Sequence, residues 1–318
     1  HCGPRFTIVE KLPYDRQNTT MKSFEMCADC RAEYENPEDR RFHAQPNACP
    51  ECGPRVELTG AFGVPLSQSQ DAIEQTIALL KEGKIIAVKG LGGFHIMCDP
   101  NNSMAVERLR QRKNRDEKPF ALMFPDPAQI ESCCLVSEEE RRLLTSPESP
   151  IVLLQKRENI SDFFHGLLEN TAPNNPQLGV ILPYTPLHHI ILQLFDGPLV
   201  ATSGNLSDET ICTLNNDAIR RLGVIVDFFL LHNRDIARHA DDSIARIIAG
   251  RPALLRRARG YAPLPITLQK DGSDALAVGG HLKNTIALKK DRHVFISQHI
   301  GDLDTESSLN SFDRTIAD

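Results

Sequence analysis

The sequence predicts an α/β protein in which a small cysteine-rich module precedes a twisted, mixed open sheet with flanking helices and a final, incomplete strand-rich segment. Three observations lead to this prediction: a C-x2-C-x18-C-x2-C array near the start, alternating helix and strand patterns from about Asp71, and strand patterns after a polar linker at residues 270–274. With 318 residues, the chain has material for one large domain and smaller pieces. We expect divisions at 1–62, 63–265 and 266–318.

Composition limits the classes of function. The net charge of −6 and a pI near 6.0 argue against a general nucleic-acid coat, although a local cluster of cations can still bind phosphates. The first residues show no signal-peptide pattern, and no apolar run reaches the roughly 18 residues that a membrane helix needs. Nine cysteines without a secretory signal predict a reducing, cytoplasmic location, with neither membrane nor nucleic acid as a partner.

The cysteine-rich module is predicted to bind zinc. Cys27, Cys30, Cys49 and Cys52 form two C-x2-C turns, and each turn can direct two sulfurs at one tetrahedral ion. The residues between the turns are too polar to build a core, so the metal supplies folding energy. Four protein ligands leave no open position, which makes the zinc structural. The alternative is that the four cysteines form two disulfides or remain free.

A tetrapeptide repeat suggests a second finger upstream. The sequence Cys2-Gly3-Pro4-Arg5 recurs 50 positions later at 52–55. If the repeat is real, Cys2 is the last ligand of a finger that begins before His1, and the chain is a piece of a longer protein. The alternative is chance reuse of four residues.

The middle of the chain alternates helices and strands. Apolar periodicity predicts helices over 72–80 after a capping Asp71, over 104–112 after Asn102 or Ser103, over 138–144 after Ser137, and from Pro186 onward. Strands are expected at 85–88, 120–124, 151–154 and 199–202. Residues 243–248 and 252–257 flank Ala249-Gly250 as a closing hairpin, so the sheet should be mixed.

The residues after the linker follow a different pattern. Residues 275–278, 285–289 and 294–297 are expected to form strands, with Gly279-Gly280 as a turn after the first of them. About 45 residues are too few for an independent domain of ordinary kind. We therefore expect this segment to belong to a larger unit.

The densest candidate site is a run of five cations within residues 110–118. Lys113, Arg115 and Lys118 lie at a helix end that leads into a strand, where open α/β sheets tend to bind ligands. Such a cluster could hold a polyphosphate. The alternative is a solvated helix terminus that the helix dipole favours.

Three further segments offer groups that could bind anions. Lys89 precedes a glycine-rich stretch at 90–93, which is either a phosphate-binding loop or a tight turn. Ser203 and Asn205 follow an apolar strand and can donate hydrogen bonds to a phosphate or carbonyl, unless they form an ordinary turn. The closing hairpin is flanked by 241–243 and 256–260, whose arginines either face solvent or bind phosphates in bidentate fashion. No Ser/His/Asp relay can be assembled, because His188 and His189 open an amphipathic helix as packing residues.

In combination these motifs resemble the HypF family, the carbamoyltransferases of nickel–iron hydrogenase maturation. Residues 26–30, 39–46 and 49–54 resemble its second zinc finger. The motifs at 113–119, 182–188, 202–205, 241–243 and 259–263 resemble its YrdC-like adenylation domain. The resemblance covers essentially the whole chain.

The resemblance implies a reaction. In that family, carbamoyl phosphate and ATP, which carries Mg²⁺, give a carbamoyl-adenylate and pyrophosphate. A following domain of the sugar-kinase/actin type passes the carbamoyl group to a C-terminal cysteine of HypE, on the route to the cyanide ligands of the hydrogenase iron. By position, Lys113, Arg115 and Lys118 would act on the phosphates, and Ser203 and Asn205 would orient the nucleotide or carbamoyl group. By the same resemblance, Ser243 with Arg256 would complete the anion pocket. Lys89 and Arg259 are the remaining nucleotide-binding residues that we expect.

The chain departs from the family pattern at both ends. The upstream acylphosphatase domain is absent, and residues 275–318 resemble only the opening strands of the transfer domain, so adenylate formation or nucleotide binding is what we expect here. A first rival function is threonylcarbamoyl-adenylate synthesis for tRNA modification, which the zinc module and the strand-rich tail disfavour. A second is a non-catalytic zinc-ribbon scaffold. Net acidity and few aromatic residues argue against nucleic acid as its ligand.

Overall fold

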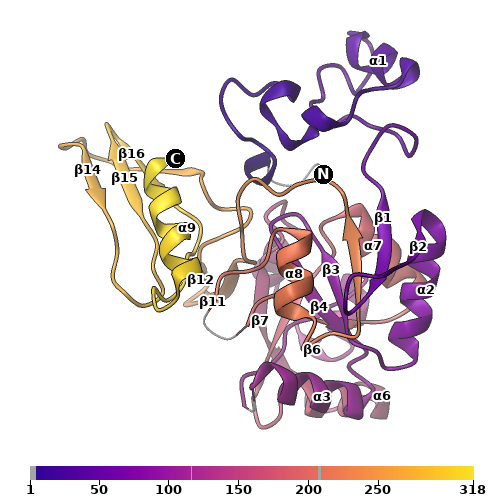
Figure 1. Ribbon diagram of the computed structural model, residues 1–318. Helices are drawn as coiled ribbons and strands as arrows, with labels where there is room; N and C mark the ends of the chain where they lie inside the picture. The colour runs from indigo at the N-terminus through magenta and orange to yellow at the C-terminus, as the bar shows by residue number, and fades with distance from the viewer. Residues whose placement is uncertain (1–4, 116, 207–208) are drawn as a thin grey trace.

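The structure is a computed structural model that describes residues 5–115, 117–206 and 209–318. Figure 1 shows a cysteine-rich module at the top, a large α/β body below it, and a small sheet with one helix at the side. Cys2, the expected ligand of an upstream finger, lies outside the described residues. Within the described ranges, no helix is both long enough and apolar enough to cross a membrane.

The elements occur in the following order. The α-helices are α1 (Ala28–Glu35), α2 (Ser69–Lys81), α3 (Ser103–Lys113), α4 (Pro127–Glu131), α5 (Glu138–Leu144), α6 (Asp162–Thr171), α7 (Pro186–Phe195), α8 (Asn215–Leu222) and α9 (Glu306–Ala317). The strands are β1 (Val56–Gly60), β2 (Pro65–Gln68), β3 (Ile86–Lys89), β4 (Phe94–Cys98), β5 (Leu122–Met123), β6 (Cys134–Leu135), β7 (Ile151–Lys156), β8 (Gln177–Ile181), β9 (Leu199–Ser203), β10 (Phe228–His232), β11 (Ile244–Ile248), β12 (Arg251–Arg256), β13 (Pro265–Thr267), β14 (Ala275–Ala277), β15 (Ala287–Lys290) and β16 (His293–Ile296).

The large sheet is mixed, as predicted. Its order is β12-β11-β7-β8-β5-β9-β4-β3-β10-β1-β2, and β6 pairs with β7. The pairs β11·β7, β5·β8 and β10·β3 are parallel, whereas β3·β4, β4·β9 and β7·β8 are antiparallel. Because β1 pairs with β10, the sheet begins at Val56, upstream of the division expected at 62.

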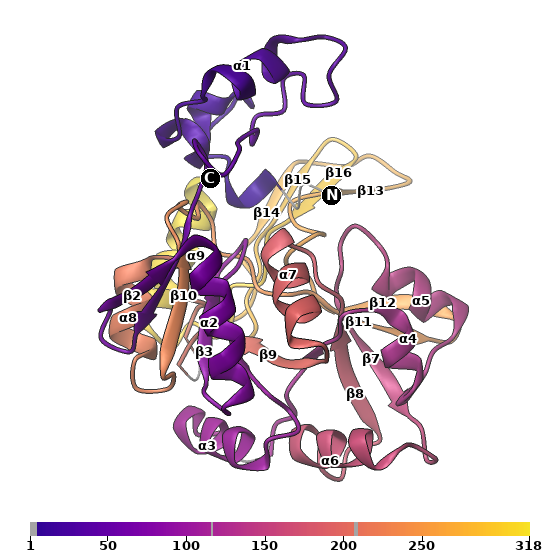
Figure 2. The same cartoon turned by 90° about the vertical axis from the view of Figure 1, so that its right-hand side faces the viewer.

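Helices cover both faces of this sheet. One apolar core lies against α2 and α7, which stand in front of the sheet in Figure 2. The other includes buried residues of α3, α5, α6 and α8. Successive residues of one strand point into opposite cores, so that Ile151 packs with the first and Val152 with the second. A strand buried on both faces therefore appears in the sequence as a continuous apolar run.

Several predicted elements are confirmed by their capping contacts. Ser137 and Glu140 form a capping box at the start of α5, with Glu140 N donating to Ser137 Oγ at 3.3 Å. The Asn102 side chain accepts from Ala105 N at 3.0 Å and starts α3. The hairpin β11–β12 is antiparallel around Ala249, as predicted.

Other predictions need correction. Asp71 does not cap α2, because the helix begins at Ser69 and Asp71 lies in its first turn. Of the strand expected at 120–124, only Leu122–Met123 pairs in the sheet. We did not predict β4, β8, β10, α6, α8 and α9.

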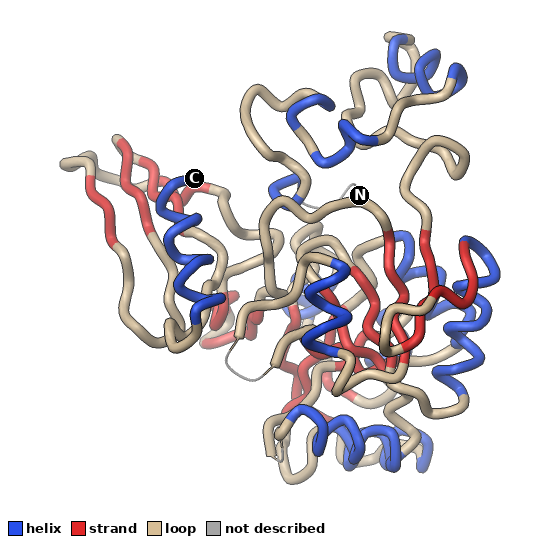
Figure 3. Tube along the Cα trace, viewed as in Figure 1, coloured by secondary structure: helices blue, strands red, loops and turns tan. Residues whose placement is uncertain are grey.

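The expected strands after the linker form a separate antiparallel sheet of order β13-β16-β15-β14. Figure 3 shows these strands beside α9, away from the large sheet. The strands expected at 285–289 and 294–297 pair with each other as β15 and β16, with Lys289 opposite Val294. The sheet starts at Pro265 because β13 pairs with β16.

Candidate functional site

The four predicted zinc ligands form one cluster. The Sγ atoms of Cys27, Cys30, Cys49 and Cys52 all lie within 4.8 Å of one another, and none of the four is in a disulfide. Cys27 Sγ is 3.8 Å from Cys49 Sγ, which is 3.7 Å from Cys52 Sγ. Sulfurs bound at about 2.3 Å to a tetrahedral zinc would be roughly 3.8 Å apart, so the geometry fits this ion.

The chain around the cysteines is held by polar contacts rather than by a core. The Arg16 guanidinium donates to the main-chain oxygens of Phe24, Gln45 and Asn47, each at 2.7 Å. Asn47 in turn donates through its side chain to Cys30 O at 2.9 Å. A module this polar depends on its metal for stability, and a closed set of four thiolates gives a structural site.

A hollow of about 690 Å³ lies where the large body meets the C-terminal segment. This size is within the usual range of ligand pockets. Its lining residues come from six separate stretches of the chain. They are Lys113, Asn114, Arg115, Glu117, Lys118, Ser203, Asn205, Leu206, Glu209, Asp241, Arg256, Lys283, His299, Ile300, Gly301 and Asp302.

Lys113 joins the C-terminus of α3 to the end of β9. Its Nζ donates to the main-chain oxygens of Ser203 and Asn205, both at 2.8 Å. Burial, together with the nearby charge of Arg115, lowers the pKa of Lys113 to about 7. The ammonium therefore fixes the Ser203–Asn205 loop at one wall of the hollow.

Arg115 and Lys118 lie on the same wall. The Arg115 guanidinium donates to Thr202 Oγ1 at 3.1 Å and to Pro119 O at 2.5 Å. Burial and the neighbouring charges of Arg110 and Arg256 lower the pKa of Arg115 to about 10, so it remains charged at neutral pH. Lys118 is exposed at the rim.

The Ser203–Asn205 loop is ordered by its own hydrogen bonds. Ser203 Oγ donates to Asn205 Oδ1 at 2.7 Å, and Asn205 Nδ2 donates to Glu209 O at 2.8 Å. Phe94 approaches the loop so closely that a Cβ on Gly204 would lie 2.5 Å from its Cβ, so position 204 requires glycine. These hydrogen bonds hold the uncharged polar groups of Ser203 and Asn205 beside the cations.

Arg256 brings a cation to the hollow from β12. Its Nε donates to Asp242 O at 2.9 Å, and its side chain lines the hollow. Asp242 is itself held inside the protein, because its carboxylate accepts from Arg259 Nε at 2.9 Å and lies 2.8 Å from His95 Nε2. The buried carboxylate thus fixes the backbone that orients Arg256.

Three predicted site residues do not line the hollow. Arg259 is 2% exposed and donates to the main-chain oxygens of Glu148 and Ser149 while stacking 3.4 Å from the Tyr184 ring centroid. The Ser243 hydroxyl donates to Arg259 O and accepts from Ala258 N. Both residues are part of the supporting framework.

Lys89 is the third of these residues. It is 2% exposed and donates to His232 O at 3.1 Å, and burial lowers its pKa to about 8. The adjoining glycines form a turn in which Gly90 N donates to Gly93 O at 2.8 Å. A Cβ on Gly92 would meet Ala240 O at 2.4 Å, so close packing accounts for this glycine.

Lys283, His299 and Asp302 line the hollow but are not among the predicted site residues, although they lie within residues 275–318, which resemble the transfer domain. No local pattern links these stretches to residues 113–118. Only the docking of the C-terminal segment brings them together.

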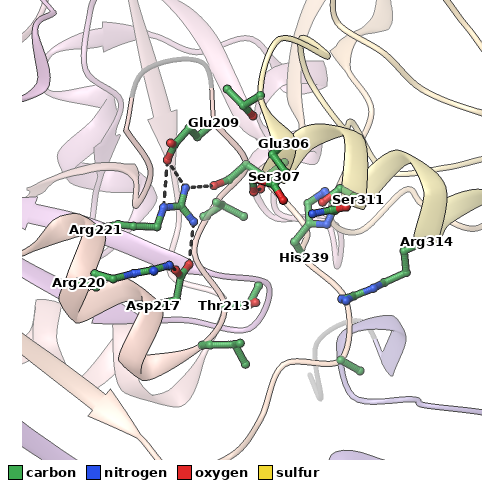
Figure 4. A pocket seen from close by; sticks show the side chains of 16 residues that line it. Glu209, Thr213, Asp217, Arg220, Arg221, His239, Glu306, Ser307, Ser311 and Arg314 are labelled. Atoms are coloured by element: carbon green, nitrogen blue, oxygen red, sulfur yellow. Dashed lines mark hydrogen bonds and ion pairs between the residues drawn. The ribbon is translucent and has the colours of Figure 1, made fainter.

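A second hollow, of about 510 Å³, lies between α8 and α9. Figure 4 shows Asp217 and Arg221 of α8 on one side, with Ser307, Ser311 and Arg314 of α9 on the other. Arg221 forms ion pairs with Glu209 and Asp217. Glu209 lines both hollows, so the two adjoin.

The larger hollow has the chemistry of a polyphosphate site. Five cationic side chains line it together with the Ser203 hydroxyl and the Asn205 amide. Lysine and arginine neutralise phosphate charge, and uncharged donors orient the ligand without adding to it. The lining also offers the carboxylates of Asp241 and Asp302, which suit a hard cation such as Mg²⁺.

Three family models match the chain. The model described as "Telomere recombination", that of the Sua5/YciO/YrdC proteins, matches residues 78–258, which is more than half of the chain. The "HypF finger" model matches residues 26–59, and the "HypF Kae1-like domain" model matches residues 270–318.

Individual proteins are similar over the whole chain. Carbamoyltransferase HypF of Synechocystis sp. is 50% identical over 318 residues, covering 100% of this chain and 41% of the relative. A crystal structure of full-length HypF in the phosphate- and nucleotide-bound form has a TM-score of 0.91 at 47% identity, covering 100% of this chain and 41% of that one. Human threonylcarbamoyl-AMP synthase is 26% identical over 162 residues, or 49% of this chain and 56% of the relative. The chain thus spans about two fifths of the length of the HypF relatives it matches.

Proposed function

This chain belongs to the HypF carbamoyltransferase family, with a Sua5/YciO/YrdC-type domain at its centre, and from that premise we propose that its larger hollow forms carbamoyl-adenylate from carbamoyl phosphate and ATP. The product would serve carbamoyl transfer to the C-terminal cysteine of HypE during synthesis of the hydrogenase cyanide ligands. The observation that supports this most directly is the convergence of Lys113, Arg115, Lys118 and Arg256 beside the Ser203–Asn205 loop. A related HypF crystallised with phosphate and nucleotide bound is consistent with it.

The reaction requires that the charge on the phosphates be neutralised and that the attacking oxygen be aligned with the α-phosphate. Hydrolysis of carbamoyl phosphate outside this hollow first gives carbamate and inorganic phosphate. A carbamate oxygen then attacks the α-phosphate of ATP, a new P–O bond forms, and the bond to the β-phosphate breaks so that pyrophosphate leaves. Negative charge develops on the phosphate oxygens, and Lys113, Arg115 and Lys118 are positioned to offset it. Ser203 and Asn205 would orient the nucleotide or the carbamoyl group through hydrogen bonds, and Arg256 would hold the far phosphates.

Lys89, Ser243 and Arg259 take a supporting role in this proposal. Arg259 and Ser243 brace the segment that carries Arg256, and Lys89 ends the strand before the glycine turn. Asp241 and Asp302 would hold the magnesium that ATP carries, and that ion would neutralise further phosphate charge.

The remaining parts of the chain fit the same proposal. Residues 1–62 would form the zinc module, 63–265 the adenylating domain, and 266–318 the linker and the start of the transfer domain. Cysteines that are free in the described residues suit a reducing compartment, so we place the activity in the cytoplasm.

Exchange of labelled pyrophosphate into ATP tests the proposal. We expect exchange when carbamoyl phosphate is supplied, or ammonium carbamate as a direct source of the attacking anion. Exchange that requires threonine and bicarbonate would instead indicate threonylcarbamoyl-adenylate synthesis. A chain that neither exchanges pyrophosphate nor binds ATP would be a scaffold.

A matched pair of lysine variants separates chemistry from folding. Lys113 and Lys156 each donate to main-chain oxygens, but only Lys113 lines the hollow. We expect Lys113→Met to lower exchange by about 100-fold, within the range of one electrostatic contact to a transition state. Lys156→Met should keep it within about threefold, and equal losses in both variants would contradict the assignment.

A further inference from the structure

One wall of the proposed nucleotide site belongs to the C-terminal segment. Lys283, His299, Ile300, Gly301 and Asp302 line the same hollow as Lys113 and Arg256. These residues fall within the match to the HypF Kae1-like domain and outside the match to the Sua5/YciO/YrdC model. The hollow is therefore shared between two family segments.

Direct contacts hold this segment against the large body. His299 N donates to Arg257 O at 2.9 Å, which joins the loop to the end of the closing hairpin. Thr210 Oγ1 and Ser307 Oγ are 2.7 Å apart, and Figure 4 shows Ser307 on the side of α9 that faces the second hollow. Arg238 Nε lies 2.8 Å from Asp318 Oδ2. The wall is thus a docked part of the fold.

The backbone at Lys283 is held in a strained conformation. Lys283 has φ of 51°, in the left-handed region that a residue with a Cβ adopts only at a cost in free energy. Its main-chain N donates to Asp302 Oδ1 at 2.6 Å. The next residue, Asn284, is 1% exposed and donates to the oxygens of Val278 and Gly280. These bonds fix the direction in which the Lys283 side chain leaves the loop.

The Lys283 ammonium is available to a ligand. Among the described residues, its Nζ makes no hydrogen bond or ion pair, whereas its main-chain N donates to Asp302 Oδ1. Burial lowers the pKa of His299; the Asp241 carboxylate opposes this shift, whereas the charges of Arg256 and Lys283 add to it. An exposed ammonium that lines the same hollow as the Arg256 guanidinium suits a phosphate oxygen.

We propose that Lys283 binds the phosphates of the nucleotide in this hollow, together with Lys113, so that the Kae1-like segment supplies part of the adenylating site. This inference rests on the proposed function, because it assigns a residue to the same site. The region in common with human threonylcarbamoyl-AMP synthase is limited to 49% of this chain. A residue of the segment 270–318 that binds the phosphates would therefore distinguish the HypF arrangement from a Sua5/YciO/YrdC domain alone.

Calorimetric titration of this chain with Mg²⁺-ATP tests the assignment. We expect Lys283→Gln to raise Kd about tenfold and Lys283→Arg to restore most of the affinity, since arginine keeps the charge. The matched control is Lys290→Gln, because Lys290 is an exposed lysine of the same segment that pairs with Asp274 and does not line the hollow. Its Kd should stay within about twofold of the parent value.

Several outcomes would overturn the assignment. Unchanged Kd in Lys283→Gln, equal losses in Lys283→Gln and Lys290→Gln, or failure of Lys283→Arg to restore binding would each do so. Absence of ATP binding by the parent chain would refute both the inference and the proposed function. Exchange that depends on threonine, together with weakened ATP binding in Lys283→Gln, would refute the proposed reaction and leave the role of Lys283 intact.

Discussion

Replacing Asp242 with asparagine removes the counter-charge of a guanidinium that lies almost wholly inside the protein. Asp242 is 9% exposed, and Arg259, its partner at 2.9 Å, is 2% exposed. The same carboxylate lies 2.8 Å from His95 Nε2. Asparagine has nearly the same shape, so the substitution tests the charge rather than the packing.

The expected loss of stability is large because no water can replace the lost carboxylate. Removal of one member of a buried ion pair typically costs about 3–5 kcal/mol. For a domain of about 200 residues, each kcal/mol lowers Tm by roughly 2–4 °C. We therefore expect Asp242→Asn to lower the Tm of the large domain by about 10 °C.

Thermal unfolding with a matched control checks this magnitude. Asp304 also pairs with a histidine, His281, but at the surface, where the two side chains are 55% and 61% exposed. Such a pair contributes about 0–1 kcal/mol, so Asp304→Asn should change Tm by no more than about 3 °C. A Tm for Asp242→Asn equal to that of Asp304→Asn would refute the reasoning.

The pH dependence provides a second readout of the same carboxylate. Burial opposes ionisation, but the charges of His95 and Arg259 and their hydrogen bonds hold the pKa of Asp242 well below its usual 3.8. Below about pH 4 the unfolded chain takes up a proton that the folded chain does not, so stability falls as the pH decreases. The Asp242→Asn variant should lack this part of the acid destabilisation, and an unchanged slope would contradict the assignment.

Three further predictions follow from the site and its framework. Elemental analysis should find about one zinc per chain. The Cys49→Ser variant should lose this zinc, while the Tm of the large domain changes little. Full retention of zinc by the variant would contradict the four cysteines as the zinc ligands. Burial lowers the pKa of Lys113 to about 7, so the side chain loses its charge above that pH. The Kd for ATP should therefore rise by up to about tenfold between pH 6.5 and 8.5. Lys113→Arg should flatten this pH dependence of Kd, and an equal slope in that variant would exclude Lys113 as its source. Gly260 has φ of +87°, and a Cβ there would lie 2.6 Å from Glu148 Cα, whereas Gly250 has φ of +73° and a Cβ there would meet open space. Gly260→Ala should therefore lower Tm by several degrees more than Gly250→Ala. Equal shifts in Tm would show that the crowding at Gly260 is relieved.

Local signals in the sequence predicted the elements whose stabilising contacts are local. Ser137 and Glu140 are three residues apart and cap α5 by themselves. The hairpin of β11 and β12 turns at Ala249-Gly250, both with positive φ. In such elements the decisive hydrogen bonds join residues close in the chain, so a short stretch of sequence is sufficient.

The elements that escaped prediction depend on distant partners. Phe94–Cys98 is a run of five buried residues without periodicity, and it becomes β4 because β3 and β9 pair with its two edges. The strand expected at 120–124 is shortened to two residues, since Phe120 N and Phe124 N bond to Thr171 O and Ile181 O outside the strand pairing. The β-propensity of a short stretch of sequence does not indicate pairing with strands that are distant in the chain.

The candidate site also combines residues that local sequence motifs indicated with residues that only distant contacts bring there. The cluster of cations at 113–118 and the Ser203–Asn205 loop were evident as motifs, and Lys113 Nζ joins them through two main-chain oxygens. Lys283 is far along the chain, and nothing near it in sequence indicates the hollow. Its place there depends on contacts such as His299 N to Arg257 O.

The sequence by itself determined the zinc ligands, the mixed α/β architecture and the family, because ligand spacing, capping pairs and motif order are properties of neighbouring residues. Only the tertiary structure decided which charged side chains face the hollow and which lie in the interior. Arg256 and Arg259 are three residues apart, yet Arg256 lines the hollow and Arg259 is enclosed with Asp242. That difference arises from the partners that packing brings to each guanidinium, since a buried charge must find its counter-charge within the fold.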